Sequence, residues 1–169
     1  MKAATTRPER HTTTVPRALP IEPVFHTAPH LQDEGGKLVA WFTEPAGAVV
    51  QLTDAAVFTK EMAEWMVGPG FVQLSQRFAI RETELYLLLD LRPMVSREPA
   101  ARPIFMNAAT KYLRLFTKVG LIPPAKPPPL YMTTLHGAVA LLSAIGPEIR
   151  VYETLAAALE AMPLRAAAK

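Results

Sequence analysis

The chain has 169 residues, half of them hydrophobic, which suffices for the core of one domain. It contains no cysteine, so disulfide bonds and thiolate metal sites are excluded and a reducing compartment is favoured. The first ten residues lack the apolar core of a signal peptide, and no stretch approaches the roughly 20 apolar residues that cross a bilayer. We therefore expect a cytoplasmic protein with no transmembrane segment.

The charge is distributed unevenly along the chain. The net charge of +3 is too small to predict nucleic-acid binding. Between Arg92 and Lys126, however, seven Lys or Arg residues stand against a single acid, Glu98, so this segment is strongly basic while the rest is mildly acidic. The basic segment is therefore the first candidate for a binding surface.

Residues 1–36 are typical of an extended Pro/Thr-rich arm. Such a segment cannot bury enough apolar surface to offset the entropy lost on ordering. Its few large apolar side chains, Val24, Phe25 and Leu31, can dock either on the domain or on a partner. In the second case the arm would hold a homo-oligomer together.

Two short strands open the folded domain and form a hairpin, at residues 37–42 and 48–52. Apolar residues then recur at helical spacing from residue 58 to 78. The sequence Gly68-Pro69-Gly70 interrupts this pattern, so we expect a kinked helix or two consecutive helices.

A continuous apolar run from Leu85 to Leu91 predicts a strand that is buried on both faces. Asp90 stands near the carboxyl end of this strand, where open α/β sheets place their working loops. It could position a ligand or a partner at the edge of the sheet. The favoured interpretation is that its carboxylate accepts backbone hydrogen bonds in the following turn.

The second half of the chain alternates helices with strands. The elements expected are a helix at 102–119 stopped by Gly120, a strand at 130–133, a helix at 135–145, a strand at 149–152 and a last helix capped by Thr154. This order predicts a single layered α/β domain with a mostly parallel four- to five-stranded sheet, an antiparallel hairpin at its N-terminal edge and helices packed on it. The domain spans residues 37–163, and residues 164–169 form a tail.

The order of elements, the Leu88-Leu89-Asp90-Leu91 strand end and the closing segment 149–154 before an Ala-rich helix resemble STAS domains. These have the anti-sigma-factor-antagonist fold, and the resemblance is to the SpoIIAA-like subgroup, which is similar to lipid-binding SEC14 domains. It covers about residues 37–163. It implies a regulatory module that binds a protein partner or, through the SEC14 similarity, a hydrophobic ligand.

In the regulatory members of that family, a serine at the start of the helix after the Asp-bearing strand is phosphorylated. The corresponding site falls at residues 98–101, where the acid Glu98 is kept and the serine is missing. Ser96 is the nearby hydroxyl and hence the candidate phosphosite. The resemblance thus implies a module without the usual phosphoacceptor.

Basic residues make up the candidate partner-binding surface. They are Arg92, Arg97, Arg102, Lys111, Arg114 and Lys118. Three of them, Lys111, Arg114 and Lys118, would share one face of the predicted helix. They could bind an acidic protein, a phosphate group or an anionic membrane surface, and the alternative is an ordinary solvated helix face.

The sequence lacks the residues that several other functions require. His26 and His30 are separated by Pro29, which disfavours the helix that would align them on a metal. A nucleophile elbow, a P-loop and a dinucleotide fingerprint are all absent, so we expect no cofactor and no catalysis. Nor does a recognition helix for specific DNA binding appear.

The sequence therefore predicts a non-enzymatic interaction and regulatory module of a bacterial cytoplasm. Two alternatives stay open. One is a module that binds a lipid or another hydrophobic ligand in a roomy apolar interior. The other is a structural protein that assembles through its N-terminal arm.

Overall fold

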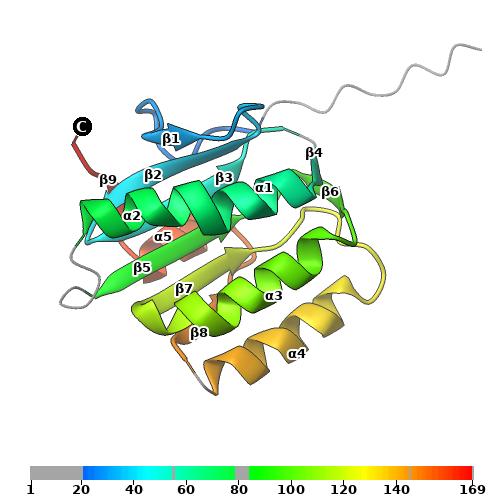
Figure 1. The fold of residues 1–169 in the computed structure, drawn as a ribbon. Coiled ribbons are helices and arrows are strands. Elements are labelled where there is room, and N and C mark those ends of the chain that lie inside the picture. Colours follow the sequence, from blue (N-terminus) through cyan, green and yellow to red (C-terminus); the bar gives the residue numbers. More distant parts are fainter. Residues whose placement is uncertain (1–20, 55, 79–83, 145, 169) are drawn as a thin grey trace, which may run out of the picture.

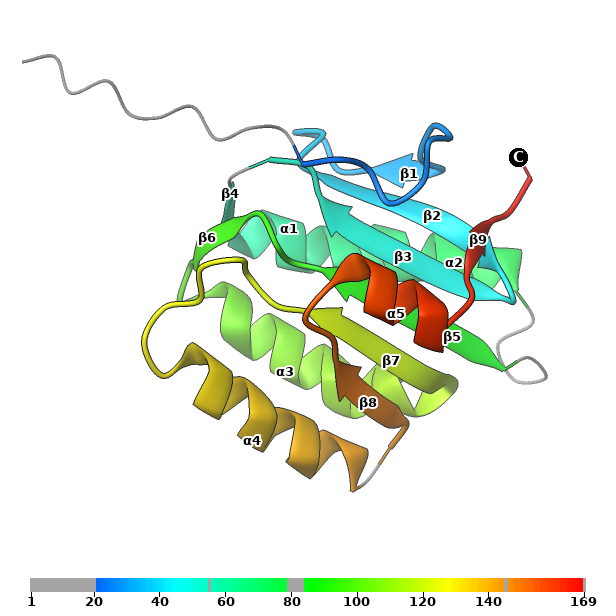
Figure 2. The same cartoon turned by 180° about the vertical axis from the view of Figure 1, so that it is seen from behind.

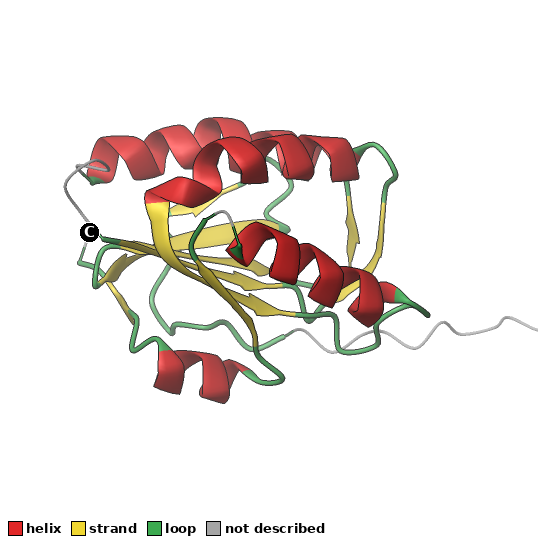
Figure 3. Ribbon diagram, turned by 90° about the horizontal axis from the view of Figure 1, so that it is seen from below, coloured by secondary structure: helices red, strands yellow, loops and turns green. Residues whose placement is uncertain are grey.

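The computed structural model describes residues 21–168, with gaps at 55, 79–83 and 145. The described part is built on one mixed sheet with helices on both sides (Figure 1, Figure 3). The strands of this sheet are β1 (Leu31–Gln32), β2 (Leu38–Glu44), β3 (Gly47–Leu52), β5 (Leu85–Asp90), β7 (Phe116–Ile122), β8 (Glu148–Val151) and β9 (Arg165–Ala166). Their order is β1-β2-β3-β5-β7-β8, with β9 paired to β2. A separate pair joins β4 (Ala56–Phe58) to β6 (Met94–Arg97).

The apolar run at β5 forms the middle of the sheet, as its sequence predicts. It pairs in parallel with β3 on one side and with β7 on the other. The β2–β3 hairpin is antiparallel, with Leu38 opposite Leu52. Five strands, β2, β3, β5, β7 and β8, form a mostly parallel sheet with an antiparallel N-terminal hairpin, which is the architecture that the sequence predicts, although β7 is not one of the predicted strands. The two-residue strands β1 and β9 extend the sheet.

The interrupted helix is also confirmed. It consists of α1 (Lys60–Trp65), the π-helical segment η1 (Met66–Gly70) and α2 (Phe71–Arg77). Thr59 caps α1, because its side-chain oxygen accepts a hydrogen bond from the Met62 amide. Pro69 lies within η1, where the wider winding accommodates a residue that cannot donate a backbone hydrogen bond.

The helix predicted at residues 102–119 is wrong in its second half. Helix α3 (Ala101–Tyr112) ends in a 3₁₀ turn, η2 (Leu113–Leu115), and the chain then enters strand β7. Gly120 is not a helix stop but a buried residue of that strand. The physical reason is tertiary: β5 needs a parallel neighbour, and the apolar residues of 116–122 fit a buried strand as well as a helix face.

The strand predicted at 130–133 is wrong for the same reason. Since β7 already fills the position beside β5, these residues begin α4 (Tyr131–Ser143) instead. The final strand and helix are confirmed as β8 and α5 (Leu155–Ala161), and the Thr154 hydroxyl accepts from the Ala157 amide at 3.1 Å.

Different helices cover the two faces of the sheet (Figure 1, Figure 2). Helices α1, α2 and α3 lie over one face, with α4 beside β8, and α5 lies over the other. The segment around Val24 and Phe25 packs on the α5 face, where the Phe25 ring meets Trp41 at 5.8 Å. The Trp41 indole donates a 2.9 Å hydrogen bond to the Thr27 carbonyl. These arm residues therefore dock on the chain's own sheet, while the rest of the predicted arm, residues 1–20, lies outside the described residues.

None of the helices in the described ranges combines the length and apolar character that crossing a membrane requires.

Candidate functional site

A cavity of about 670 Å³ lies between the sheet and the helices of the α1–α4 side. Its sheet wall is formed by inward-facing apolar side chains of β2, β3, β5 and β7, such as Ala40, Val50 and Leu89. Its helical wall comes from α1, η1, α2, α3 and α4, with Trp65 and Phe105 among the larger contributors. The lining is therefore drawn from most of the elements of this half of the molecule.

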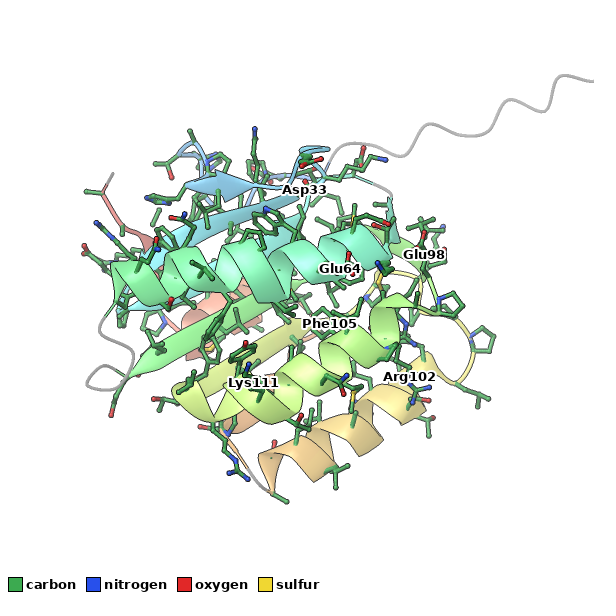
Figure 4. The ribbon with its side chains drawn as sticks, in the orientation of Figure 1. Asp33, Glu64, Glu98, Arg102, Phe105 and Lys111 are labelled. Atoms are coloured by element: carbon green, nitrogen blue, oxygen red, sulfur yellow. The ribbon has the colours of Figure 1, made fainter. Side chains whose placement is uncertain are left out.

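The cavity exists because α3 rests on its neighbouring helices more than on the sheet. Its main backbone contacts are with α1 and η1. Aromatic pairs brace these contacts: Phe105 packs edge-on to Phe58 at 5.6 Å, and Tyr112 stacks on Phe71 at 4.2 Å. Figure 4 shows Phe105 between α3 and α1.

Small side chains keep the space beneath α3 and α4 empty. Ala108 and Ala109 on α3 and Ala138 on α4 line the cavity from the helical side. Ala40 and Ala48 line it from β2 and β3. Larger apolar residues at these five positions would fill much of the volume.

One end of the cavity carries all of its exposed lining residues, and we call this end the cavity mouth. They are Ser96, Arg97, Arg102, Pro128, Pro129, Leu130 and Thr134. Every other lining residue is buried or half-buried. A ligand would therefore enter between β6, the start of α3 and the start of α4.

Leu130 is an unusual residue at the cavity mouth. Its side chain is 79% exposed, and its backbone has a φ of 63° in the left-handed region. Among the described residues it is the one non-glycine with a positive φ. A leucine held in this conformation carries local backbone strain.

The mouth is positively charged. Of the described residues that line the cavity, Arg97 and Arg102 are the charged ones, and no Asp or Glu lines it. In the described part of the chain neither arginine forms a salt bridge. Burial raises the pKa of Tyr131, and the nearby Arg97 guanidinium partly opposes that rise, which places this hydroxyl and this charge at the same end.

The Asp90 side chain is buried in a hydrogen-bond network and is not exposed to a ligand or partner. Its carboxylate is fully buried and accepts hydrogen bonds from the Arg92 backbone amide at 3.2 Å, as predicted for the turn. It also accepts two from the Arg92 guanidinium, at 2.8 and 2.7 Å, and one from the Gln51 amide at 2.9 Å. This pairing raises the pKa of Arg92.

Gln51 extends this network to the N-terminal segment. Its side-chain carbonyl accepts from the Val24 amide at 3.2 Å, and its side-chain nitrogen donates to the Glu22 carbonyl at 3.1 Å. Asp90 therefore fixes the end of β5 and, through Gln51, the path of residues 22–24. Arg92, a predicted partner-binding residue, is committed to this network.

The remaining predicted basic residues do not form one helix face. Arg97 and Arg102 lie at the cavity mouth, whereas Lys111 and Arg114 are exposed at the opposite end of α3 and on η2 (Figure 4). Lys118 is on β7, not on a helix, and its ammonium lies 3.8 Å from a Glu148 carboxylate oxygen. The prediction of a single face is wrong because α3 ends at Tyr112.

Ser96, the candidate phosphosite, is exposed on β6 opposite Val57. It is not at the start of α3, whose N-cap is Ala100 and makes no side-chain hydrogen bond. As for metals, the described residues contain no group of three or more His, Cys, Asp or Glu side chains that could hold an ion. His30 is engaged in packing, since its ring lies 5.3 Å from that of Phe42 and its Nδ1 accepts from the Phe42 amide.

No family model matches the chain, and no curated protein matches it in sequence. Among solved structures it is similar to an uncharacterized protein of the DUF3478 family from Shewanella loihica PV-4, described as having a SpoIIAA-like fold. The TM-score is 0.52 at 13% sequence identity, and the match covers 74% of this chain and 91% of that one. The chain has a SpoIIAA-like fold. This agrees with the resemblance seen in the sequence, and at such low identity it concerns the SpoIIAA-like fold alone.

Proposed function

We propose that this SpoIIAA-like protein binds a hydrophobic ligand of lipid type in the cavity between its sheet and α3, without catalysis. The observation that carries the proposal is the cavity itself, about 670 Å³ of apolar-lined space with one exposed end. Ligand pockets typically enclose about 300–1,000 Å³, so the volume is in the expected range.

Packing favours a hydrocarbon occupant of this apolar space. Water would find few hydrogen-bond partners among these apolar walls, whereas a hydrocarbon chain would restore the missing contacts.

Native mass spectrometry of the purified full-length protein tests the proposal directly. We expect a co-purified hydrophobic molecule that is released on denaturation. A titration with an apolar fluorescent dye should show saturable binding and energy transfer from Trp65, which lines the cavity. The Trp65→Phe variant should bind the dye with a smaller transfer signal, the remainder coming from Trp41 on the neighbouring strand β2.

A matched pair of variants on α3 separates cavity binding from surface adsorption. Ala108 lines the cavity and the adjacent Asn107 is exposed, so Ala108→Leu should weaken dye binding while Asn107→Leu should not. A wild-type protein that carries no hydrophobic molecule and shows no saturable binding would contradict the proposal.

A second candidate is the protein-interaction module that the STAS resemblance implies. It is supported by exposed apolar side chains at the same end of the molecule, where Val95 is 61% and Val57 45% exposed beside Ser96. A partner that contacts Val95 and Arg97 would be lost on a Val95→Asp change. Binding of an identified partner that survives this change in a folded variant would argue against this surface.

A further inference from the structure

The cavity has a polarity gradient that specifies what kind of hydrophobic ligand it takes. Its polar lining side chains gather at the mouth, where Arg97, Arg102 and Tyr131 lie with Ser96 and Thr134. Away from the mouth, the lining side chains that carry a polar atom are those of Tyr112, whose ring is stacked on Phe71, and Trp65. An ionised group placed deep in the cavity would thus lose its hydration without gaining partners.

On this basis we propose that the ligand is a single-chain fatty acid, with its carboxylate held at the mouth by Arg97 and Arg102 and its tail in the apolar interior. The inference rests on the proposed function and names the ligand class of the same cavity. Guanidinium groups suit this role because their paired N–H donors match the two oxygens of a carboxylate.

Two acids on this side of the molecule, Glu98 and Glu64, have partners of their own. A Glu98 carboxylate oxygen accepts a hydrogen bond from the Lys60 amide at 2.8 Å, and Glu64 forms a 2.7 Å salt bridge with the Lys60 ammonium. Figure 4 shows Glu64 and Glu98 around the start of α1, and Arg102 at the start of α3. Neither acid lines the cavity, and among the described residues neither forms a salt bridge with Arg97 or Arg102, so the guanidinium donors of both arginines are left for a ligand.

The helices add to this positive field. Both α3 and α4 begin at the mouth end and run away from it (Figure 1). Their first turns, which consist of described residues, contain no acid, and neither helix has a side-chain cap. The partial positive charge of each helix N-terminus therefore supplements Arg97 and Arg102.

Size favours a ligand with one chain. A methylene group takes up about the volume of a water molecule, about 30 Å³, so the cavity matches on the order of 20 carbon atoms. A single long acyl chain has this size, whereas a two-chain phospholipid has more than twice as many atoms.

Calorimetric titration with dodecanoic acid and with dodecanol tests the inference on the full-length protein. The two probes share the same tail, so only the head differs. We expect the acid to bind at least about tenfold more tightly than the alcohol, as a charge-assisted hydrogen-bond pair would give. Equal affinities would overturn the carboxylate assignment and leave the proposed cavity function intact.

Charge-neutralising variants then locate the head. Arg97→Gln with Arg102→Gln should weaken the acid about tenfold or more and leave the alcohol unchanged. The matched control, Lys111→Gln with Arg114→Gln, removes the same charge at the other end of α3 and should change neither. An equal loss of acid affinity in both double variants would mean that net charge, not the mouth, attracts the acid.

The remaining outcomes are also decisive. If the first double variant fails to fold by circular dichroism, Arg102→Gln alone and the wild-type preference for acid over alcohol still decide the assignment. Tighter binding of a two-chain phospholipid would overturn the single-chain class. Absence of binding by both probes, together with absence of dye binding, would overturn the proposed function itself.

Discussion

Leu88 and Leu89 are neighbours on β5, yet they belong to two differently packed regions. Leu88 faces α5 and is fully buried against Trp41, Ala158 and Met162. Leu89 faces the opposite side and borders the cavity beneath α3. We call these the closed face and the open face of the sheet.

The closed face is tightly packed around Gly120. A Cβ atom built on Gly120 of β7 would overlap the Met162 Cε and stand 2.9 Å from the Leu88 Cδ1. On the open face, by contrast, alanines leave space for a ligand. Because both faces share the same strands, the closed face can supply the stability that the hollow face does not.

Truncation of the two leucines tests this division of roles and should give the largest effect. Leu88→Ala should lower the free energy of unfolding by about 4 kcal/mol, because it creates a new void in a packed core. Leu89→Ala should cost only about half as much, because that side chain already borders empty space. Urea denaturation of ligand-free protein measures both, and equal losses would contradict the comparison.

Removal of the Asp90 carboxylate should have the next largest effect. Asp90→Ala leaves the Arg92 guanidinium without its carboxylate and removes one of the two acceptors of the Gln51 side-chain nitrogen, which should cost about 3 kcal/mol. The value lies at the lower end for a broken buried pair because the Arg92 side chain is 26% exposed.

Glu148→Ala, which breaks exposed ion pairs with Lys118 and Arg150, is the control for the Asp90 change and should cost less than about 1 kcal/mol. Chemical denaturation followed by circular dichroism compares the two. A similar loss of stability in both variants would contradict a stabilising role for the buried Asp90 network.

A single added methyl group gives the smallest of the three effects and the most direct comparison of the faces. Gly120→Ala should destabilise the protein by about 2 kcal/mol, since Met162 must move to admit the new group. Ala108→Leu adds more atoms on the open face and should change stability by less than about 1 kcal/mol. Thermal unfolding of the two variants measures the difference, and a larger loss for Ala108→Leu would contradict the hollow face.

The sequence predicts those elements in which local signals agree with the tertiary structure. The apolar run of β5 indicates a central strand, and Gly68-Pro69-Gly70 indicates the break in the first helix. The prediction from sequence is wrong at residues 113–122, where Phe116 and Val119 fit the spacing of a helix as well as that of a strand. Only the need of β5 for a second neighbour selects the strand, and that need is not local.

The residue pattern alone does not predict the cavity, because a filled core and a hollow one have the same apolar pattern. A roomy interior is only an alternative that the SEC14 similarity implies. The small residues Ala108 and Ala138 are compatible with a cavity. Whether they leave one depends on the distance of α3 and α4 from the sheet, which the sequence does not give. The engagement of Arg92, in contrast, could have been foreseen. Asp90 and Arg92 carry opposite charges and are two residues apart across a turn. Such residues tend to form an ion pair with each other, which leaves the arginine less available to a partner.

The left-handed conformation of Leu130 has a consequence for how the protein could be stabilised. Glycine adopts this backbone without strain, so Leu130→Gly removes a conformational penalty of about 1 kcal/mol. The same change deletes a 79% exposed leucine from the entrance of the cavity. Leu130 therefore combines a backbone penalty with part of the apolar surface at the cavity mouth, and a change that relieves the first also removes the second.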